Sequence, residues 1–288
     1  MESSLVPVRP VRPAAAYLGG KRVLSSRLVR MIDAIDHKTY VEPFVGMGGV
    51  FLRRTRQPSL EVINDLSRDV ATLYRVLQRH YQAFFDMLKW QLAGRAEFGR
   101  LMSTNPETLT DLERAARFLY LQRLAFGGKV EGRTFGISRD LPARFNPARM
   151  EETLADLHDR LAGVVIECLP YAEVIRRYDG PNTLFYLDPP YWGNEADYGP
   201  GTFAREDFER LADQLAQIRG RFILSINATD GAREVFGRFA IEEVDCTYTI
   251  SRGNGAKVRE LIVSGVYDTG NSGFNDAQTL HQGGGVGR

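Results

Sequence analysis

An acid, two prolines and an aromatic ring stand together at Asp188-Pro189-Pro190-Tyr191. The preceding apolar run, residues 183–187, is short and rich in aromatic and aliphatic side chains, which predicts a buried strand. Each proline fixes its own φ, so the strand should end in a stiff corner that holds a carboxylate, a proline carbonyl and a ring in fixed relation. Such a corner suits a flat nitrogenous ring that presents an amino group. The alternative is a plain turn, because four-residue motifs recur by chance.

A glycine-rich turn, residues 42–49, follows a short predicted strand at residues 39–41 and precedes a helix expected near Val50. A second predicted strand, residues 60–63, runs into Asn64 and Asp65. This order is the first half of a nucleotide-binding βαβ unit, and an acid at the tip of the second strand is placed to accept hydrogen bonds from ribose hydroxyls. The turn lacks the glycine spacing of dinucleotide sites, so we expect an adenosine-type ligand without a pyrophosphate. The alternative role for Asp65 is a helix cap.

Tyr17 and Lys21 flank a pair of glycines near the start of the chain. Glycines permit close approach of a ligand to the backbone, so the ring and the lysine could grip an anionic or aromatic ligand. A plain turn is the alternative.

The elements that must position these residues alternate between strands and helices. Such alternation predicts a mostly parallel sheet with helices on both faces, and ligands of such sheets bind beyond the carboxyl ends of the strands. Gly46, Asp65, Asp188 and Asn227 all lie at predicted carboxyl ends, so the fold should gather them along one edge. Between the two βα regions, residues 74–152 predict a mainly helical insert with a basic, glycine-rich loop.

Composition narrows the class of protein. The 288 residues suit one large domain or one domain with an insertion, and no apolar run is long enough to span a bilayer. Two distant cysteines and four scattered histidines indicate reduced thiols and no metal site. The net charge is only +1, yet between residues 122 and 150 six basic residues accompany two acidic ones. Such a local excess is typical of a phosphate-binding face, and a solvated basic surface is the alternative.

Together these motifs resemble those of the Dam-type, alpha-group DNA adenine methyltransferases. The resemblance covers roughly residues 15–266. It rests on the order of the motifs: an aromatic residue before Gly-Gly-Lys, a Glu-Pro-Phe-Val-Gly-Met-Gly-Gly turn, an acid after the second strand, an insert for target recognition, and Asp-Pro-Pro-Tyr. It implies a Rossmann-like α/β sheet of the kind found in S-adenosylmethionine-dependent methyltransferases, with a mainly helical target-recognition insert.

The resemblance also implies S-adenosylmethionine as methyl donor. The implied lining of the donor pocket is Tyr17, Lys21, Glu42, Phe44, Gly46, Gly48, Gly49, Asp65 and Asp188. Two departures from the family pattern stand out. Tyr17 replaces a frequent tryptophan, and Leu169 or Pro170 stands where many members carry an acid near the donor adenine.

The implied acceptor is an adenine flipped out of double-stranded DNA. Its exocyclic amine is a poor nucleophile, because the nitrogen lone pair is delocalised into the ring. Asp188 and the carbonyl of Pro189 would each accept one amine hydrogen, Pro190 would stiffen the corner, and Tyr191 would offer a face to the base. No metal is required. The residues expected to contact DNA are Arg123, Lys129, Arg133, Arg139, Arg144 and Asn146.

The expected organisation is a flexible arm (1–14), a donor-binding half of the catalytic domain (15–73), the insert (74–152), the Asp-Pro-Pro-Tyr half (153–267) and a disordered tail (268–288). We expect a cytoplasmic monomer, bacterial or phage-encoded, that acts on double-stranded DNA; a cognate restriction endonuclease and a solitary role both stay open. The alternatives are transfer to cytosine in DNA, to adenine in RNA or to a protein amide, and a catalytically silent DNA-binding module. Related families commonly carry Ser or Asn in place of Asp188, so this residue favours DNA adenine.

Overall fold

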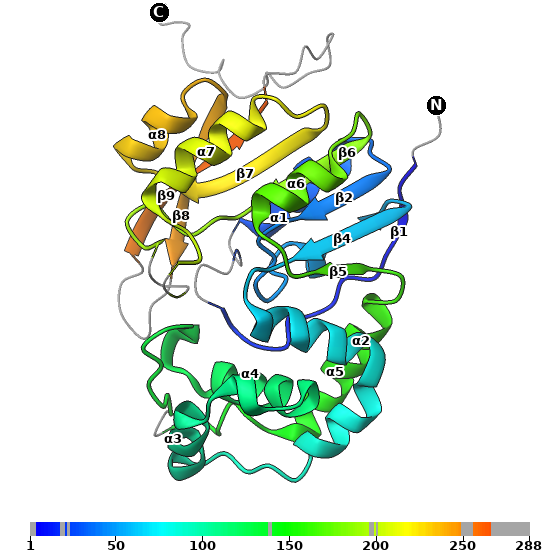
Figure 1. Cartoon of the computed structure of the whole chain (residues 1–288), viewed down its shortest axis with the longest axis vertical. Coiled ribbons are helices and arrows are strands. Elements are labelled where there is room, and N and C mark those ends of the chain that lie inside the picture. The colour runs from blue at the N-terminus through cyan, green and yellow to red at the C-terminus, as the bar shows by residue number, and fades with distance from the viewer. Residues whose placement is uncertain are drawn as a thin grey trace, which may run out of the picture.

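The computed structural model describes residues 4–17, 21, 24–137, 140–195, 199, 201–248 and 256–265. Its centre is a seven-stranded sheet in the order β5-β4-β2-β6-β7-β9-β8 (Figure 1). The first five strands in this order, β5, β4, β2, β6 and β7, are mutually parallel, and β9 runs antiparallel to both β7 and β8. The strands are β2 (Thr39–Glu42), β4 (Leu60–Asn64), β5 (Val165–Glu167), β6 (Thr183–Leu187), β7 (Arg221–Asn227), β8 (Ala240–Tyr248) and β9 (Ala256–Ser264). The expected Rossmann-like α/β sheet is confirmed.

Helices cover both faces of the sheet, because successive residues of a strand point to opposite faces. In β6, Leu184 and Tyr186 join the core that contains helix α1 (Ser25–Ala34). Phe185 and Leu187 join the opposite core. The helices of that second core are α6 (Tyr171–Tyr178), α7 (Arg205–Leu215) and α8 (Asp230–Phe236). All five residues of β6 are therefore buried, which holds the corner that follows them on a rigid base.

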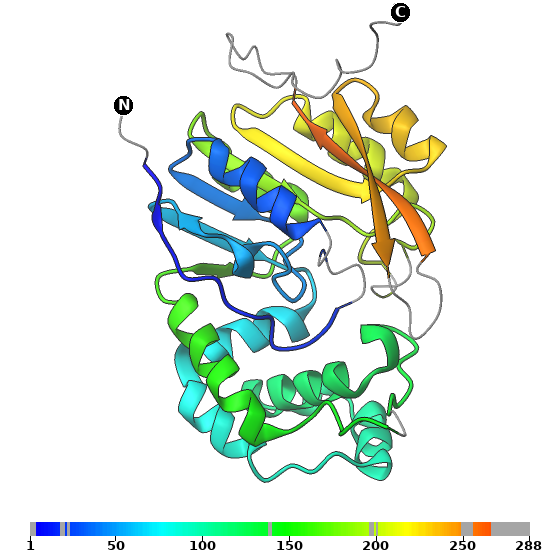
Figure 2. The ribbon, with the colours of Figure 1, turned by 180° about the vertical axis from the view of Figure 1, so that it is seen from behind.

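The insert is mainly helical, as expected, and lies beside the sheet in both views (Figures 1 and 2). It comprises α2 (Arg68–Leu88), α3 (Arg95–Ser103), α4 (Asp111–Leu124) and α5 (Pro147–Arg160), with short 3₁₀ turns η2 (Pro106–Thr108) and η3 (Phe126–Gly128). α2 starts at the sheet, just beyond the tip of β4, and α5 leads back to β5. α2 runs across the border expected at residue 74, and α5 runs across the border expected at residue 152. Each helix therefore belongs partly to the sheet region and partly to the insert.

The N-terminal segment differs from the flexible arm that we expected over residues 1–14. Val6–Pro7 (β1) pairs with Arg56–Gln57 (β3), and the amide of Val11 donates to the carbonyl of Leu52 at 2.8 Å. Leu5, Val11, Ala14 and Ala15 are buried. These apolar residues therefore anchor residues 4–15 along the sheet and the insert, as Figure 2 shows for the blue segment. The expected tail, residues 268–288, lies outside the described residues.

Two further expectations concern helices. The helix expected near Val50 is only a 3₁₀ turn, η1 (Phe51–Arg53), because the chain returns at once to pair β3 with β1. In the described part of the chain, no helix is long and apolar enough to cross a bilayer.

Candidate active site

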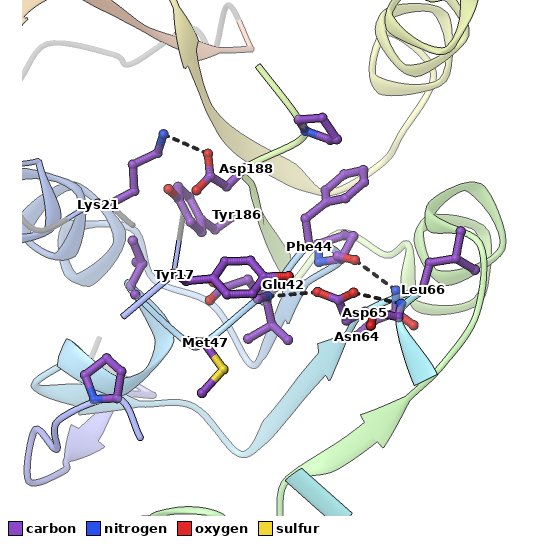
Figure 3. A pocket seen from close by; sticks show the side chains of 18 of the residues that line it. Tyr17, Lys21, Glu42, Phe44, Met47, Asn64, Asp65, Leu66, Tyr186 and Asp188 are labelled. Atoms are coloured by element: carbon purple, nitrogen blue, oxygen red, sulfur yellow. Dashed lines mark hydrogen bonds and ion pairs between the residues drawn. The ribbon is translucent and has the colours of Figure 1, made fainter. Parts of the chain in front are cut away.

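A cavity of about 910 Å³ opens at the edge of the sheet where β2, β4 and β6 end (Figure 3). Parallel strands place their carboxyl ends together, which is why motifs far apart in the sequence meet here. The expected pocket residues that line it are Tyr17, Lys21, Glu42, Phe44, Gly46, Gly49, Asp65 and Asp188. Of the expected set only Gly48 is not in the lining; an added Cβ there would meet Leu52 and the Tyr74 hydroxyl.

The glycine turn brings its backbone close to the cavity. Gly46 has a φ of +49°, and a Cβ on it would lie 2.8 Å from the ring of Tyr17. A side chain at this position would therefore strain the backbone and clash with the ring of Tyr17. The sequence indicated a turn here, and the structure shows why glycine is needed.

Gly46→Ala is expected to destabilise the fold by about 1–2 kcal/mol, because alanine disfavours the left-handed backbone and its methyl group would push against Tyr17. Thermal unfolding of the purified variant measures this. Gly99→Ala is the matched control, since Gly99 lies in α3 with nothing within 4 Å of the added methyl group. That change should be neutral or slightly stabilising. An equal melting temperature for the two variants would contradict the strain at Gly46.

Asp65 sits at the tip of β4 with both carboxylate oxygens anchored. The amide of Gly46 donates to Oδ2 and the amide of Ser67 donates to Oδ1, each at 2.9 Å. Burial raises the pKa of Asp65 to about 6, although the two amide hydrogen bonds lower it. Because Ser67 is the N-cap residue of α2, Asp65 also braces the start of that helix. One carboxylate thus ties the glycine turn to the helix that carries the insert.

Glu42 is a buried acid in the cavity wall. The Tyr40 hydroxyl donates to its Oε2 at 2.9 Å. Burial raises the pKa of Glu42 to about 8, so near pH 7 this carboxyl is mostly neutral. Glu42 therefore presents the cavity with a polar group that carries little charge.

Asp188 stands in the stiff corner at the end of β6 with one side of its carboxylate held. Lys21 Nζ lies 2.9 Å from Oδ1, and the Ser225 hydroxyl donates to the same oxygen at 3.3 Å. Among the described residues, Oδ2 has no hydrogen-bond donor, and the side chain keeps 21% of its surface exposed. Burial raises the pKa of Asp188 to about 6, against the Lys21 ammonium, which lowers it. The corner therefore presents a hydrogen-bond acceptor to the cavity.

Tyr191 and Lys21 form one unit behind this corner. Lys21 is 1% exposed, and its ammonium donates to the Tyr191 hydroxyl at 2.6 Å. The ammonium also lies 4.3 Å from the centre of the Tyr191 ring. Pro190 lines the cavity, whereas Pro189 and Tyr191 do not. Lys21 thus contacts both the acid and the ring of the corner.

Three rings form the wall near Asp65. Phe44, Tyr171 and Phe203 lie pairwise 5.5–5.9 Å apart between ring centres. Leu169 lines the same cavity, and the acids in its lining are Glu42, Asp65 and Asp188 alone among the described residues. The sequence pattern did not point to Phe203, which comes from an irregular segment without a motif, whereas Tyr171 ends the stretch that the family resemblance places near the donor adenine. This wall is an apolar surface suited to a flat ring.

Trp192 and Asn227 fix the chain after the corner. The Asn227 side chain accepts from the Trp192 amide at 2.8 Å and donates to its carbonyl at 3.0 Å. The indole stacks on Phe208 at 4.8 Å and fills the place where a Cβ of Gly231 would stand. Asn227, which the strand-end argument placed at this edge, therefore acts on the backbone of the corner.

The residues expected to contact DNA divide into two groups. Arg123 donates to the carbonyls of Ala14 and Arg144, Arg133 donates to Gln122, and Asn146 caps α5. These three side chains hold the insert together as well as facing its surface. Lys129 and Arg144 are exposed, and Arg144 with Arg123 lines the cavity. Arg139 lies outside the described residues.

A metal centre has no support from the arrangement of side chains. Within the described ranges, no group of three or more His, Cys, Asp or Glu side chains is placed to hold a metal ion. The cysteines are also separate, with Cys246 buried in β8 and Cys168 half-buried after β5.

Comparison with known proteins gives consistent results. Residues 17–250 match the family model described as D12 class N6 adenine-specific DNA methyltransferase. The chain is 25% identical over 249 residues to "Type II methyltransferase M.CviBI" of Paramecium bursaria Chlorella virus NC1A, which covers 85% of this chain and 94% of the relative. It is 27% identical over 263 residues to a "DNA adenine methylase" of Vibrio cholerae (85% and 93% covered) and 26% identical over 264 residues to one of Serratia marcescens (85% and 95% covered).

Proposed function

Because the chain belongs to the D12 class N6 adenine-specific DNA methyltransferase family, we propose that it transfers a methyl group from S-adenosylmethionine to the N6 amine of an adenine flipped out of double-stranded DNA. The observation that supports this most is the carboxylate of Asp188. Lys21 and Ser225 hold its Oδ1 from behind, which leaves Oδ2 to accept a hydrogen bond from a substrate amine.

The cavity suits the proposed donor. Its volume of about 910 Å³ is within the range of small-molecule sites. Asp65 offers carboxylate oxygens beside the glycine turn for ribose hydroxyls, and the wall of Phe44, Tyr171 and Phe203 suits a nucleobase. Bound S-adenosylmethionine would supply an electrophilic methyl carbon attached to a positively charged sulfur. Tyr17 and Lys21 would close the remaining side of this pocket.

The corner residues would make the adenine amine nucleophilic. Asp188 Oδ2 and the carbonyl of Pro189 would each accept one N–H, which draws the nitrogen toward tetrahedral geometry and localises its lone pair. The amine would then take the methyl group as the carbon–sulfur bond breaks, and it would take over the positive charge while the sulfur leaves as a neutral thioether. Asp188 or water would accept the extra proton of the amine. The ring of Tyr191 would support the flipped base.

The insert would hold the DNA. Lys129 and Arg144 are exposed cations, of which Arg144 lines the cavity, and both suit phosphate contacts, whereas Arg123 and Arg133 would act mainly by shaping the loop that carries them. Arg139 and Asn146 complete the proposed contact set. The names of the relatives include type II methyltransferases, which supports a cognate restriction endonuclease as a proposed partner. A cytoplasmic monomer that acts on its own stays a proposal as well.

Methyl transfer from S-adenosylmethionine labelled in its methyl group tests the class of acceptor. We expect label in duplex DNA, and little or none in RNA of the same sequence or in an unrelated protein. Asp213→Asn, on the exposed side of α7 and outside the cavity lining, should behave like the wild type. Label confined to RNA or protein would overturn the proposal.

A further inference from the structure

Glu260 is a buried acid that none of the sequence motifs includes. It lies on β9, opposite Asn227 of β7 in the strand register, and its side chain is 0% exposed. It does not line the cavity. Acids are rarely buried so completely unless they are paired, so its contacts indicate what it does.

Both carboxylate oxygens of Glu260 face the unit behind the corner. Lys21 Nζ lies 3.2 Å from Oε2, and the Tyr191 hydroxyl donates to Oε1 at 2.8 Å. The same ammonium lies 2.9 Å from Asp188 Oδ1 and donates to the Tyr191 hydroxyl. Among the described residues, Glu260, Lys21, Tyr191 and Asp188 thus form one connected cluster of two carboxylates, one ammonium and one phenol.

These contacts constrain the parts of the corner that would meet the substrate. The Tyr191 hydroxyl accepts from Lys21 and donates to Glu260, so its ring cannot rotate out without breaking both bonds. Lys21 stands between the two carboxylates and is therefore held at a fixed point beside Asp188 Oδ1. Removing Glu260 would leave both groups with fewer constraints, although neither would leave the corner.

We propose that Glu260 is a positioning residue for methyl transfer: it holds Lys21 and Tyr191 from behind, and through them it sets the direction of Asp188 Oδ2 and of the Tyr191 ring. This proposal rests on the function proposed above. Glu260 touches neither donor nor acceptor; its effect reaches the reaction through the two side chains that it binds.

The negative charge of Glu260 also affects the pKa of Asp188. Burial raises the pKa of Asp188, Lys21 lowers it, and the negative charge of Glu260 raises it. Removing that charge should therefore lower the pKa of Asp188. The fall of kcat on the acidic side of its pH profile should then occur at lower pH. In the part of the chain that the structure describes, the titratable and charged groups that face Asp188 or Glu260 from the packed elements are Lys21, Glu42, Tyr186, Tyr191 and Cys246.

The test compares Glu260→Gln with Glu260→Asp. The Gln variant keeps the size and an acceptor for the Tyr191 hydroxyl but loses the charge opposite Lys21. We expect its kcat to fall about tenfold. We also expect the midpoint of the acidic limb of its kcat–pH profile, measured at saturating donor, to move down by about half a pH unit. The Asp variant keeps the charge on a shorter side chain, so kcat should fall while the midpoint stays near the wild-type value. Donor affinity by calorimetry should change by less than about threefold in both.

Glu209→Gln is the matched control, an exposed glutamate on α7 that should leave kcat and the pH profile unchanged. A Glu260→Gln variant with wild-type kcat and a wild-type acidic limb would overturn the positioning role. So would a loss of kcat with an unmoved limb and a lowered melting temperature, which would indicate a structural role only. A wild-type protein that transfers no methyl group would instead overturn the proposed function, so the two failures are distinguishable.

Discussion

Replacing Asp188 by Asn is expected to lower kcat by about a thousandfold, while affinity for duplex DNA stays close to that of the wild type. The structure explains why an isosteric change should cost so much. Lys21 and Ser225 both donate to the Oδ1 position, so they would hold the carbonyl oxygen of the asparagine there. The amide NH₂ would then occupy the Oδ2 position and point its hydrogens at the hydrogens of the substrate amine.

The same role predicts how the wild-type rate depends on pH. Lys21 and Ser225 occupy Oδ1, so a proton on Asp188 would sit on Oδ2 and turn this acceptor into a donor; the pKa of Asp188 is about 6 because burial raises it. As pH falls through this value the carboxylate is protonated, so kcat should fall about tenfold per pH unit below it. Saturating donor is needed, because Asp65 also has a pKa of about 6.

Single-turnover rates with gel-shift measurements of DNA binding check both statements. Asp213→Asn serves as the control, because it removes only an exposed ion pair with Arg238. An Asp188→Asn variant that retains more than about a tenth of the wild-type rate would contradict the role of the carboxylate, since loss of one catalytic hydrogen-bond partner costs more.

Replacing Asp65 by Ala is expected to weaken the affinity for S-adenosylmethionine by about 10- to 100-fold. Two effects act together. The ribose hydroxyls would lose their proposed acceptor, and the amide of Gly46 would lose the bond that fixes the glycine turn. Affinity for duplex DNA should change much less, because Asp65 belongs to the sheet edge and not to the exposed face of the insert.

Calorimetry with S-adenosylmethionine and its demethylated product measures this without turnover. Asp65→Asn should fall between the wild type and the Ala variant, because its single carbonyl oxygen can accept from Gly46 or from Ser67 but not from both. Donor affinity of the wild type should also weaken as pH falls through about 6, where Asp65 becomes protonated. An unchanged affinity in the Ala variant would rule out the ribose role.

The sequence was informative where function depends on strand ends. Gly46, Asp65 and Asp188 could be placed at one edge because each follows an apolar run and parallel strands share the direction of their carboxyl ends. Asp65 also contacts the start of α2, where its carboxylate accepts from the amide of Ser67. The alternative role of helix cap is therefore compatible with its place in the cavity lining.

The sequence was less informative where a side chain acts through tertiary packing. Glu260 reaches Lys21 only because β9 turns back antiparallel beside β7, a register that no local pattern specifies. Arg123 is one of five basic candidates by charge, yet its guanidinium bonds to backbone carbonyls. The N-terminal segment, rich in proline and arginine, was wrongly expected to be flexible because its few apolar residues find partners only in the folded chain.

The identity of the methylated nucleoside tests the central claim most directly. Duplex DNA incubated with the wild-type protein and S-adenosylmethionine is digested to nucleosides and analysed by mass spectrometry, with the Asp188→Asn variant beside it. We predict N6-methyl-2′-deoxyadenosine from the wild type and much less of this product from the variant. Methylation at N4 of cytosine, or equal product from both proteins, would contradict the assignment of the Asp188 corner to the adenine amine.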